Sequence, residues 1–301
     1  MNDYAIETVG LTKYYGERLG IGDVSIKVPS GSIYGLLGPN GAGKTTMIRL
    51  LLGFLCPTSG QARVAGFNIR SQTLKVRENV GYLPGEVRLF NHLTGYKTLK
   101  YLAGLRENDC LTRAEQLARR LDLDLHLKMR FCSRGMRQKL ALIQAMMHDP
   151  AVLILDEPTN SLDPLMQQEV YDLLREYARE GGTVFFSSHI ISEVERICDY
   201  VAIVRAGHLV ADDTIQQLRK RSLQHVRLEL KNGAVLPDPL PEGLQLLSQD
   251  GSLVHLVAEG AVEPLRKILT TLEVEYLTIE PPSLEEVFMR FYRKEVVDHA
   301  P

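Results

Sequence analysis

Short apolar runs alternate with amphipathic stretches along the first two-thirds of the chain. The clearest runs are residues 33–37, 151–155 and 183–188. They lack the polar alternation of surface strands, as strands do when both faces of a parallel sheet are covered. The stretches between them place apolar residues three and four positions apart, which indicates helices. This alternation predicts an α/β domain built on a doubly wound parallel sheet.

Weaker patterns add further strands around this framework. Period-two alternation predicts strands at residues 4–9 and 24–28, joined by a polar connection. Short strands are also expected at residues 61–65 and 79–84, the second of which ends at a proline. The turn sequence Ala206-Gly207 between two alternating stretches predicts a hairpin at residues 200–211.

A mostly helical region interrupts the α/β pattern from about residue 86 to residue 147. Helical spacing is clear at residues 94–104 and 112–123. Ser133 is a suitable N-cap for a further helix, and basic residues follow it closely. The free N–H groups of that helix end predict a second anion site. The alternative is an ordinary capped helix with a solvated basic face.

The turn between the first buried strand and the helix that follows it fits G-x-x-x-x-G-K-[ST]. Its glycines let the backbone wrap closely around an anion, and the helix, predicted to begin at about Lys44, points its positive dipole end at the same place. Lys44 adds a charge near the β- and γ-phosphates, and the Thr45 hydroxyl is suited to bind Mg²⁺. A glycine-rich turn that matches by chance is the alternative. The residues that we expect to contact the nucleotide here are Gly38, Pro39, Asn40, Gly41, Ala42, Gly43, Lys44, Thr45 and Thr46.

Polar residues follow two of the buried strands. Asp156 and Glu157 end the run that begins at residue 151, and His189 follows the run at residues 183–188. Ligands of open α/β sheets bind beyond the carboxyl ends of such strands. Asp156 is therefore expected to reach the hydration shell of Mg²⁺, and Glu157 to take a proton from an attacking water. His189 lies at the same edge of the sheet and is expected to hydrogen-bond the γ-phosphate. The alternatives are solvated acids at a strand end and a structural histidine.

An aromatic residue lies in the polar connection before residue 24. The Tyr15 ring is a candidate to stack on a purine base, and a tyrosine in a surface loop is the alternative. From Asp163 and Pro164 a further helix is expected, because an N-cap aspartate is followed by proline at the first helical position.

Composition limits the class of protein. The chain has 301 residues and 45% hydrophobic content, which allows one large domain or two smaller ones. A formal net charge of −2 gives no overall attraction to nucleic acid, and we expect no nucleic-acid partner. The four cysteines lack metal or redox spacing and are expected to be reduced thiols of a cytosolic protein. We find no signal peptide, and the longest apolar run, residues 50–56, is too short to span a bilayer.

The pattern changes near residue 221. Strands are expected at residues 226–230, 253–258 and 273–279, with helices at residues 262–272 and about 284–292. We therefore predict two domains, residues 1–221 and 222–301. The second is a small α+β domain in which we find no catalytic group of residues.

These motifs together resemble the nucleotide-binding subunit of an ABC transporter over roughly the first two-thirds of the chain. The resemblance implies a P-loop NTPase of the ABC type, with an antiparallel β subdomain and a helical insertion at about residues 86–147, and ATP and Mg²⁺ as ligands. The motifs that carry it are Gly38 to Thr45, similar to the Walker A loop; residues 152–157, similar to the Walker B strand with its catalytic glutamate; residues 161–163, similar to the D-loop; His189, similar to the switch histidine; and Tyr15, similar to the adenine-stacking aromatic.

Two motifs depart from the family pattern. The signature LSGGQ reads Cys132-Ser133-Arg134-Gly135-Met136, which keeps the serine and the second glycine. The resemblance implies that Ser133 and Gly135 face the γ-phosphate bound to a partner subunit. The Q-loop glutamine is replaced by Gly85 and Glu86, and Glu86 is expected to act through water or the metal.

The resemblance implies an ATPase coupled to transmembrane transport, with Lys44, Glu157 and His189 as its catalytic residues. Residues 282–288 in the added C-terminal domain are similar to those of exporters. The implied partners are a second copy or a homologous ATPase subunit, and a separate transmembrane permease that holds the chain at the inner face of the cell membrane.

Other ABC-type proteins are the alternatives. A protein acting on ribosomes would usually carry two phosphate loops, and a chromosome-maintenance ATPase needs a long coiled-coil insertion between Thr46 and Ser133. The sequence has one such loop and no such insertion. A soluble ABC-type ATPase or regulator without a membrane partner stays open.

Overall fold

A computed structural model describes residues 3–106, 110–220, 224–231, 236–237, 239–258, 263–270, 272–280, 285–286 and 288. The chain divides into two compact units, Met1–Asp212 and Asp213–Pro301. The division falls nine residues before the predicted boundary at residue 221. Each unit is described by itself below.

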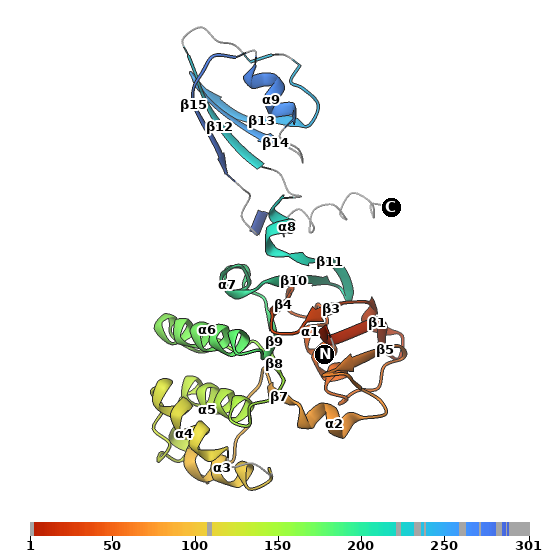
Figure 1. Ribbon diagram of the computed structural model, residues 1–301, viewed down its shortest axis with the longest axis vertical. Coiled ribbons are helices and arrows are strands. Elements are labelled where there is room, and N and C mark those ends of the chain that lie inside the picture. Colours follow the sequence, from red (N-terminus) through yellow and green to blue (C-terminus); the bar gives the residue numbers. More distant parts are fainter. Residues whose placement is uncertain are drawn as a thin grey trace. The chain divides into compact units, whose positions relative to one another are not determined.

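Parallel strands form the centre of the first unit, in the order β10–β4–β9–β8–β7 (Figure 1). Every residue of β4, β8 and β9 is buried, which explains the unbroken apolar runs of their sequences. The predicted parallel sheet is therefore confirmed. The strands are β4 (Ile33–Leu37), β7 (Val80–Leu83), β8 (Val152–Asp156), β9 (Thr183–Ser188) and β10 (Tyr200–Arg205).

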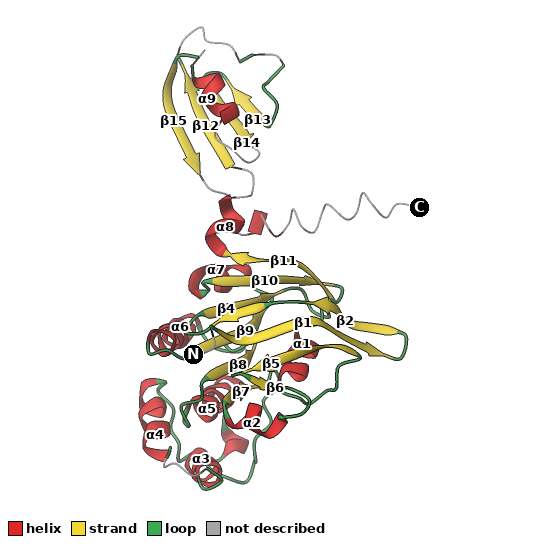
Figure 2. Cartoon of the chain, turned by 45° about the vertical axis from the view of Figure 1, so that its right-hand side comes forward, coloured by secondary structure: helices red, strands yellow, loops and turns green. Residues whose placement is uncertain are grey.

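Antiparallel strands extend the same sheet in the order β6–β5–β1–β2, and β11 lies between β2 and β10 (Figure 2). β3 pairs with β1. These strands form the antiparallel part that the resemblance implied. Their bounds are β1 (Tyr4–Tyr15), β2 (Arg18–Val24), β3 (Lys27–Pro29), β5 (Ser59–Val64), β6 (Phe67–Asn68) and β11 (His208–Thr214).

The predicted polar connection after residue 9 is wrong, because β1 and β2 form one long hairpin. Tyr15 pairs with Arg18 across the turn, where Gly16 adopts a φ of +62°. The pairing register shifts twice between Leu11 and Tyr14. Each shift interrupts the two-residue period, so the strand is not visible as an alternating pattern.

Helices cover the sheet and form a separate group beyond β7. The helical region predicted at residues 86–147 contains α3, α4, η1 and α5, and Figure 1 shows α3, α4 and α5 together at one end of this unit. Asp163 caps α6 ahead of Pro164, as predicted. Thr94 also caps α3, by accepting a hydrogen bond from the Lys97 N–H at 3.2 Å. The helices are α1 (Lys44–Leu51), α2 (Thr73–Glu78), α3 (Gly95–Ala103), α4 (Leu111–Arg120), η1 (Met129–Phe131), α5 (Arg134–Met146), α6 (Pro164–Arg179) and α7 (Ile191–Ile197).

The second unit has a sheet and a core of its own. Its strands lie in the order β13–β14–β12–β15, all antiparallel, and α9 packs on them through Leu265 and Ile268. The helix predicted at residues 284–292 and the exporter-like stretch 282–288 lie largely outside the described residues. The elements are α8 (Ile215–Lys220), β12 (Gln224–Leu230), β13 (Leu244–Asp250), β14 (Leu253–Ala258), α9 (Glu263–Leu269) and β15 (Val274–Glu280).

Within the described residues of both units, no helix has the length and apolar character needed to cross a bilayer.

Candidate functional site

The loop between β4 and α1 depends on glycine at two places. Gly43 precedes α1 with a φ of +108°, and a Cβ there would lie 2.7 Å from the Gly20 carbonyl oxygen. A Cβ on Gly38 would lie 2.4 Å from the Val204 carbonyl oxygen. Any side chain at either position would displace neighbouring backbone. α1 begins at Lys44, as predicted, and its N-terminus therefore adjoins the loop.

Lys44 is folded back over this loop. Its Nζ donates to the carbonyl oxygens of Gly38 at 2.7 Å and Pro39 at 3.1 Å, and only 6% of the residue is exposed. Burial lowers the pKa of the ammonium, and the nearby carboxylates of Glu157 and Asp156 oppose that shift. A cation held by neutral carbonyls can exchange them for phosphate oxygens, which bind it more strongly.

A hydroxyl and a carboxylate meet at the first turn of α1. Thr45 Oγ1 donates to Asp156 Oδ2 at 3.0 Å, and Ser187 Oγ donates to the other carboxylate oxygen of Asp156. Mg²⁺ prefers such oxygen ligands and usually keeps several waters and phosphate oxygens, so the pair fits this ion. The described residues contain no group of three or more His, Cys, Asp and Glu that could hold a metal alone.

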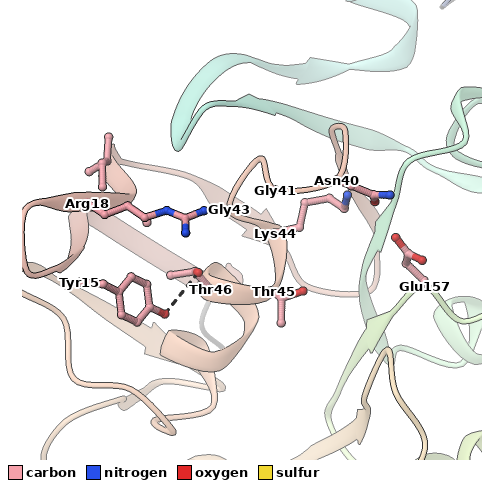
Figure 3. Close-up of a pocket in the computed structure, with 11 residues that line it drawn as sticks. Tyr15, Arg18, Asn40, Gly41, Gly43, Lys44, Thr45, Thr46 and Glu157 are labelled. Carbon is pink, nitrogen blue, oxygen red and sulfur yellow. Dashed lines mark hydrogen bonds between the residues drawn. The ribbon is translucent and has the colours of Figure 1, made fainter.

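Glu157 and His189 form the next pair along the strand ends. His189 Nδ1 lies 3.0 Å from Glu157 Oε1. The Glu157 backbone has a φ of +52°, a left-handed conformation that is uncommon for residues other than glycine. Its side chain lies across from Lys44 and Asn40 in Figure 3. A carboxylate that is oriented by a histidine and aimed into a pocket can accept a proton.

Lys44, Thr45 and Glu157 line a pocket of about 420 Å³, whereas Asp156 and His189 contact these lining residues without lining the pocket themselves. Gly38, Pro39 and Ala42 are not among its lining residues: they belong to the loop behind it, and Ala42 packs into the core. The lining residues are Tyr15, Arg18, Leu19, Gly20, Asn40, Gly41, Gly43, Lys44, Thr45, Thr46 and Glu157.

Tyr15 closes one side of this pocket from the end of β1. Its hydroxyl lies 3.4 Å from Thr46 Oγ1, drawn as a dashed line in Figure 3, and the residue is 45% exposed. Arg18 and Leu19 at the start of β2 also line the pocket and were missed by the sequence analysis. The signal that would have found them is the hairpin turn at Gly16, which places them opposite Tyr15.

Ser133 and Gly135 lie at a different place, the exposed N-terminus of α5. Ser133 Oγ accepts from the Met136 N–H at 3.2 Å, so the predicted N-cap is confirmed. A Cβ on Gly135 would lie 2.9 Å from the Ser161 carbonyl oxygen, which makes glycine necessary for this close packing. The residues predicted to bind nucleotide therefore form two groups, one in the pocket and one at this helix end.

Glu86 is neither a lining residue nor buried. Its side chain is 79% exposed and forms an ion pair with Arg88 at 3.0 Å. Gly85 is the residue next to the Thr45 and Asp156 pair, since a Cβ on it would lie 3.2 Å from Asp156 Oδ2. The metal-binding role of Glu86 stays a prediction.

Comparisons with known proteins point to one family. A protein-family model described as ABC transporter matches residues 21–160. The bacitracin transport ATP-binding protein BcrA of Enterococcus faecalis is 36% identical over 257 residues, which cover 83% of each protein. The Nod factor export ATP-binding protein I of Rhizobium meliloti is 30% identical over 98% of this chain and 90% of its own length. A solved ATP-binding subunit of an ABC transporter has a TM-score of 0.67 at 30% identity, and the alignment covers 71% of this chain and 92% of that one.

Proposed function

Because this chain belongs to the family of ABC transporter ATP-binding proteins, whose activity is ATP hydrolysis, we propose that it is the ATPase subunit of an exporter. ATP-binding subunits of this family dimerise and work with transmembrane permease subunits. The exporter assignment is supported by the similarity to the Nod factor export protein along nearly the whole chain.

The observation that carries the proposal is the meeting of Lys44, Thr45 and Asp156 beside one pocket. The loop N–H groups and Lys44 would hold the phosphates of ATP, and the half-exposed ring of Tyr15 offers a surface for the base. Thr45 and Asp156 would hold Mg²⁺, which neutralises charge on the phosphate oxygens when bound.

Glu157 is the proposed base. Its carboxylate takes a proton from water as the water oxygen bonds to the γ-phosphorus and the bond to the bridging oxygen of ADP breaks. His189 holds that carboxylate through the 3.0 Å contact at Nδ1. The products are ADP and phosphate, with the transferred proton on Glu157.

The helix end at Ser133 and Gly135 would complete the site of a second subunit. Ser133 is exposed, and this end of α5 does not line the pocket of its own chain. An exposed helix N-terminus favours anions, so a γ-phosphate held by Lys44 of one copy is stabilised further by α5 of the other. ATP then joins two subunits, and hydrolysis lets them separate.

The Glu157→Gln variant tests this proposal. It removes the base but keeps the shape and the hydrogen-bonding capacity of the side chain. We expect ATP hydrolysis to slow roughly 100-fold or more while nucleotide affinity is retained. We also expect an ATP-dependent dimer to accumulate, detected by size exclusion in Mg-ATP. The exposed Glu180→Gln variant is the matched control and should behave as the wild type.

The same variant tests the membrane partner. The full chain with Glu157→Gln, loaded with Mg-ATP, is used as bait on detergent-solubilised membranes, and retained proteins are identified. A retained polytopic membrane subunit supports the exporter assignment. Recovery of the bait alone would favour a soluble ATPase, and a monomer with unchanged hydrolysis would contradict the role of Glu157.

A further inference from the structure

A buried glutamine connects α5 to the backbone that carries Glu157. Gln138 lies in the second turn of α5 and is 6% exposed. Its Nε2 donates to the carbonyl oxygens of Glu157 at 3.2 Å and Pro158 at 3.1 Å. Both partners are acceptors only, so the amide nitrogen must face them and the orientation of the side chain is fixed.

The peptide groups on both sides of Glu157 are held from different elements. The Glu157 N–H donates to the carbonyl oxygen of Ser187 at 3.1 Å, at the end of β9. The Glu157 C=O is held by Gln138 from α5. Glu157 has a left-handed backbone conformation, which is strained for any residue other than glycine. Such a conformation persists only where the surrounding structure imposes it. These two contacts set the direction in which the carboxylate leaves the backbone.

α5 fits the same loop at a second point. Gly135, nearly one turn before Gln138, packs so closely on the Ser161 carbonyl that a Cβ would lie 2.9 Å from its oxygen. Ser161 itself has a φ of +66°. The loop after β8 is therefore matched to α5 at both ends, and a shift of the helix would move the loop.

We propose that Gln138 is a positioning residue for Glu157, which ties the geometry of the base to the position of α5. The helix end at Ser133 and the carboxylate of Glu157 belong to one mechanically connected unit of the chain. A displacement at Ser133 reaches Glu157 through this amide. The proposal rests on the proposed function, since Glu157 must act as the base.

The Gln138→Glu variant tests the proposal with almost no change of shape. An ionised carboxylate has no hydrogen to donate and is repelled by the two carbonyl oxygens, and a protonated carboxyl group can donate to only one of them. We expect kcat for ATP hydrolysis to fall about 10-fold, because a misplaced catalytic group loses orientation. KM and the dissociation constant of a fluorescent ATP analogue should stay within about twofold, since Gln138 does not line the pocket.

Asn79→Asp is the matched control. Asn79 Nδ2 donates to the Lys75 carbonyl oxygen at 2.9 Å at the exposed end of α2, so this change also places a carboxylate against a backbone carbonyl. We expect kcat to be unchanged. If Asn79→Asp lowers kcat as much as Gln138→Glu, the effect is general and the proposal is overturned.

A double-mutant cycle with Glu157→Gln separates positioning from a structural role. If Gln138 acts through Glu157, adding Gln138→Glu to Glu157→Gln should lower the residual rate by less than twofold. A further 10-fold loss in the double variant would overturn the proposal. Full activity of Gln138→Glu with an inactive Glu157→Gln would overturn this inference alone, whereas full activity of Glu157→Gln would overturn the proposed base and this inference together.

Discussion

Two adjacent carboxylates at the end of β8 differ because of a change in the backbone between them. Asp156 ends the strand in extended conformation and is held by the hydroxyls of Thr45 and Ser187. Glu157 turns to a φ of +52° and meets His189 instead. One position along the chain therefore separates a residue suited to hold a metal from one suited to accept a proton.

The partly buried residue His148 makes the stability of the fold depend on pH. It follows α5, and burial, aided by the positive charge of Arg106, lowers its pKa from 6.5 to about 4. Between these values the unfolded chain binds a proton that the folded chain does not, so stability falls as the pH drops from 7 to 5. We expect His148→Gln to reduce this fall in the free energy of unfolding by about 1 kcal/mol, a value that allows for solvent screening of the partly exposed ring.

Urea unfolding at pH 7 and pH 5 measures this difference. The free energy of unfolding of the wild type should drop more between the two pH values than that of His148→Gln. His208→Gln is the control, since this exposed histidine lies on β11. If the free energy of unfolding depends on pH equally in the wild type and in His148→Gln, the burial of His148 does not cause the loss of stability at pH 5.

At the scale of elements, a buried carboxylate joins the segments that carry Glu157 and His189. Glu193 on α7 is 6% exposed and accepts hydrogen bonds from three hydroxyls. The donors are Thr159 in the loop after β8, Tyr171 on α6 at 3.0 Å, and Ser188 at the end of β9 at 2.6 Å. Thr159 is two residues from Glu157, and Ser188 precedes His189. The network therefore fixes both loops against α6 and α7.

Glu193→Ala should be strongly destabilising. It leaves three buried hydroxyls without their acceptor, and hydrogen bonds to charged groups contribute about 1.5–3 kcal/mol each, although not additively. We expect a loss of about 3 kcal/mol in the free energy of unfolding, measured in urea. The exposed Glu180→Ala, at the residue that follows α6, should change it by less than about 0.5 kcal/mol. A similar small loss for Glu193→Ala would show that the network is not stabilising.

Elements with a local signal were predictable, and those fixed by distant contacts were not. The buried strands, the caps Ser133 and Asp163 and the start of α1 follow from short stretches of sequence. The β1–β2 hairpin was missed because its register shifts break the alternation, and Arg18 was missed with it. The contact of Gln138 with Glu157 joins residues 19 positions apart, and no pattern within α5 indicates it.

At the scale of the whole molecule, the two units have separate cores. The core of the first unit contains strand and helix residues up to Val204. The core of the second begins at Val226 and includes Leu265 and Ile268 from α9. The family resemblance stated from motifs of the first unit is confirmed by relatives that match along most of the chain.

Separate cores predict that the first unit folds alone, provided that the cut spares β11. This strand lies between β2 and β10, and its Asp212 accepts a hydrogen bond from the buried Tyr34 of β4. A fragment of residues 1–220 should therefore unfold cooperatively and bind a fluorescent ATP analogue within about twofold of the full chain. A fragment of residues 1–207 lacks β11 and should lose both properties, because the strand that links β2 to β10 is gone. Failure of the longer fragment to bind nucleotide would mean that the first unit depends on residues beyond 220.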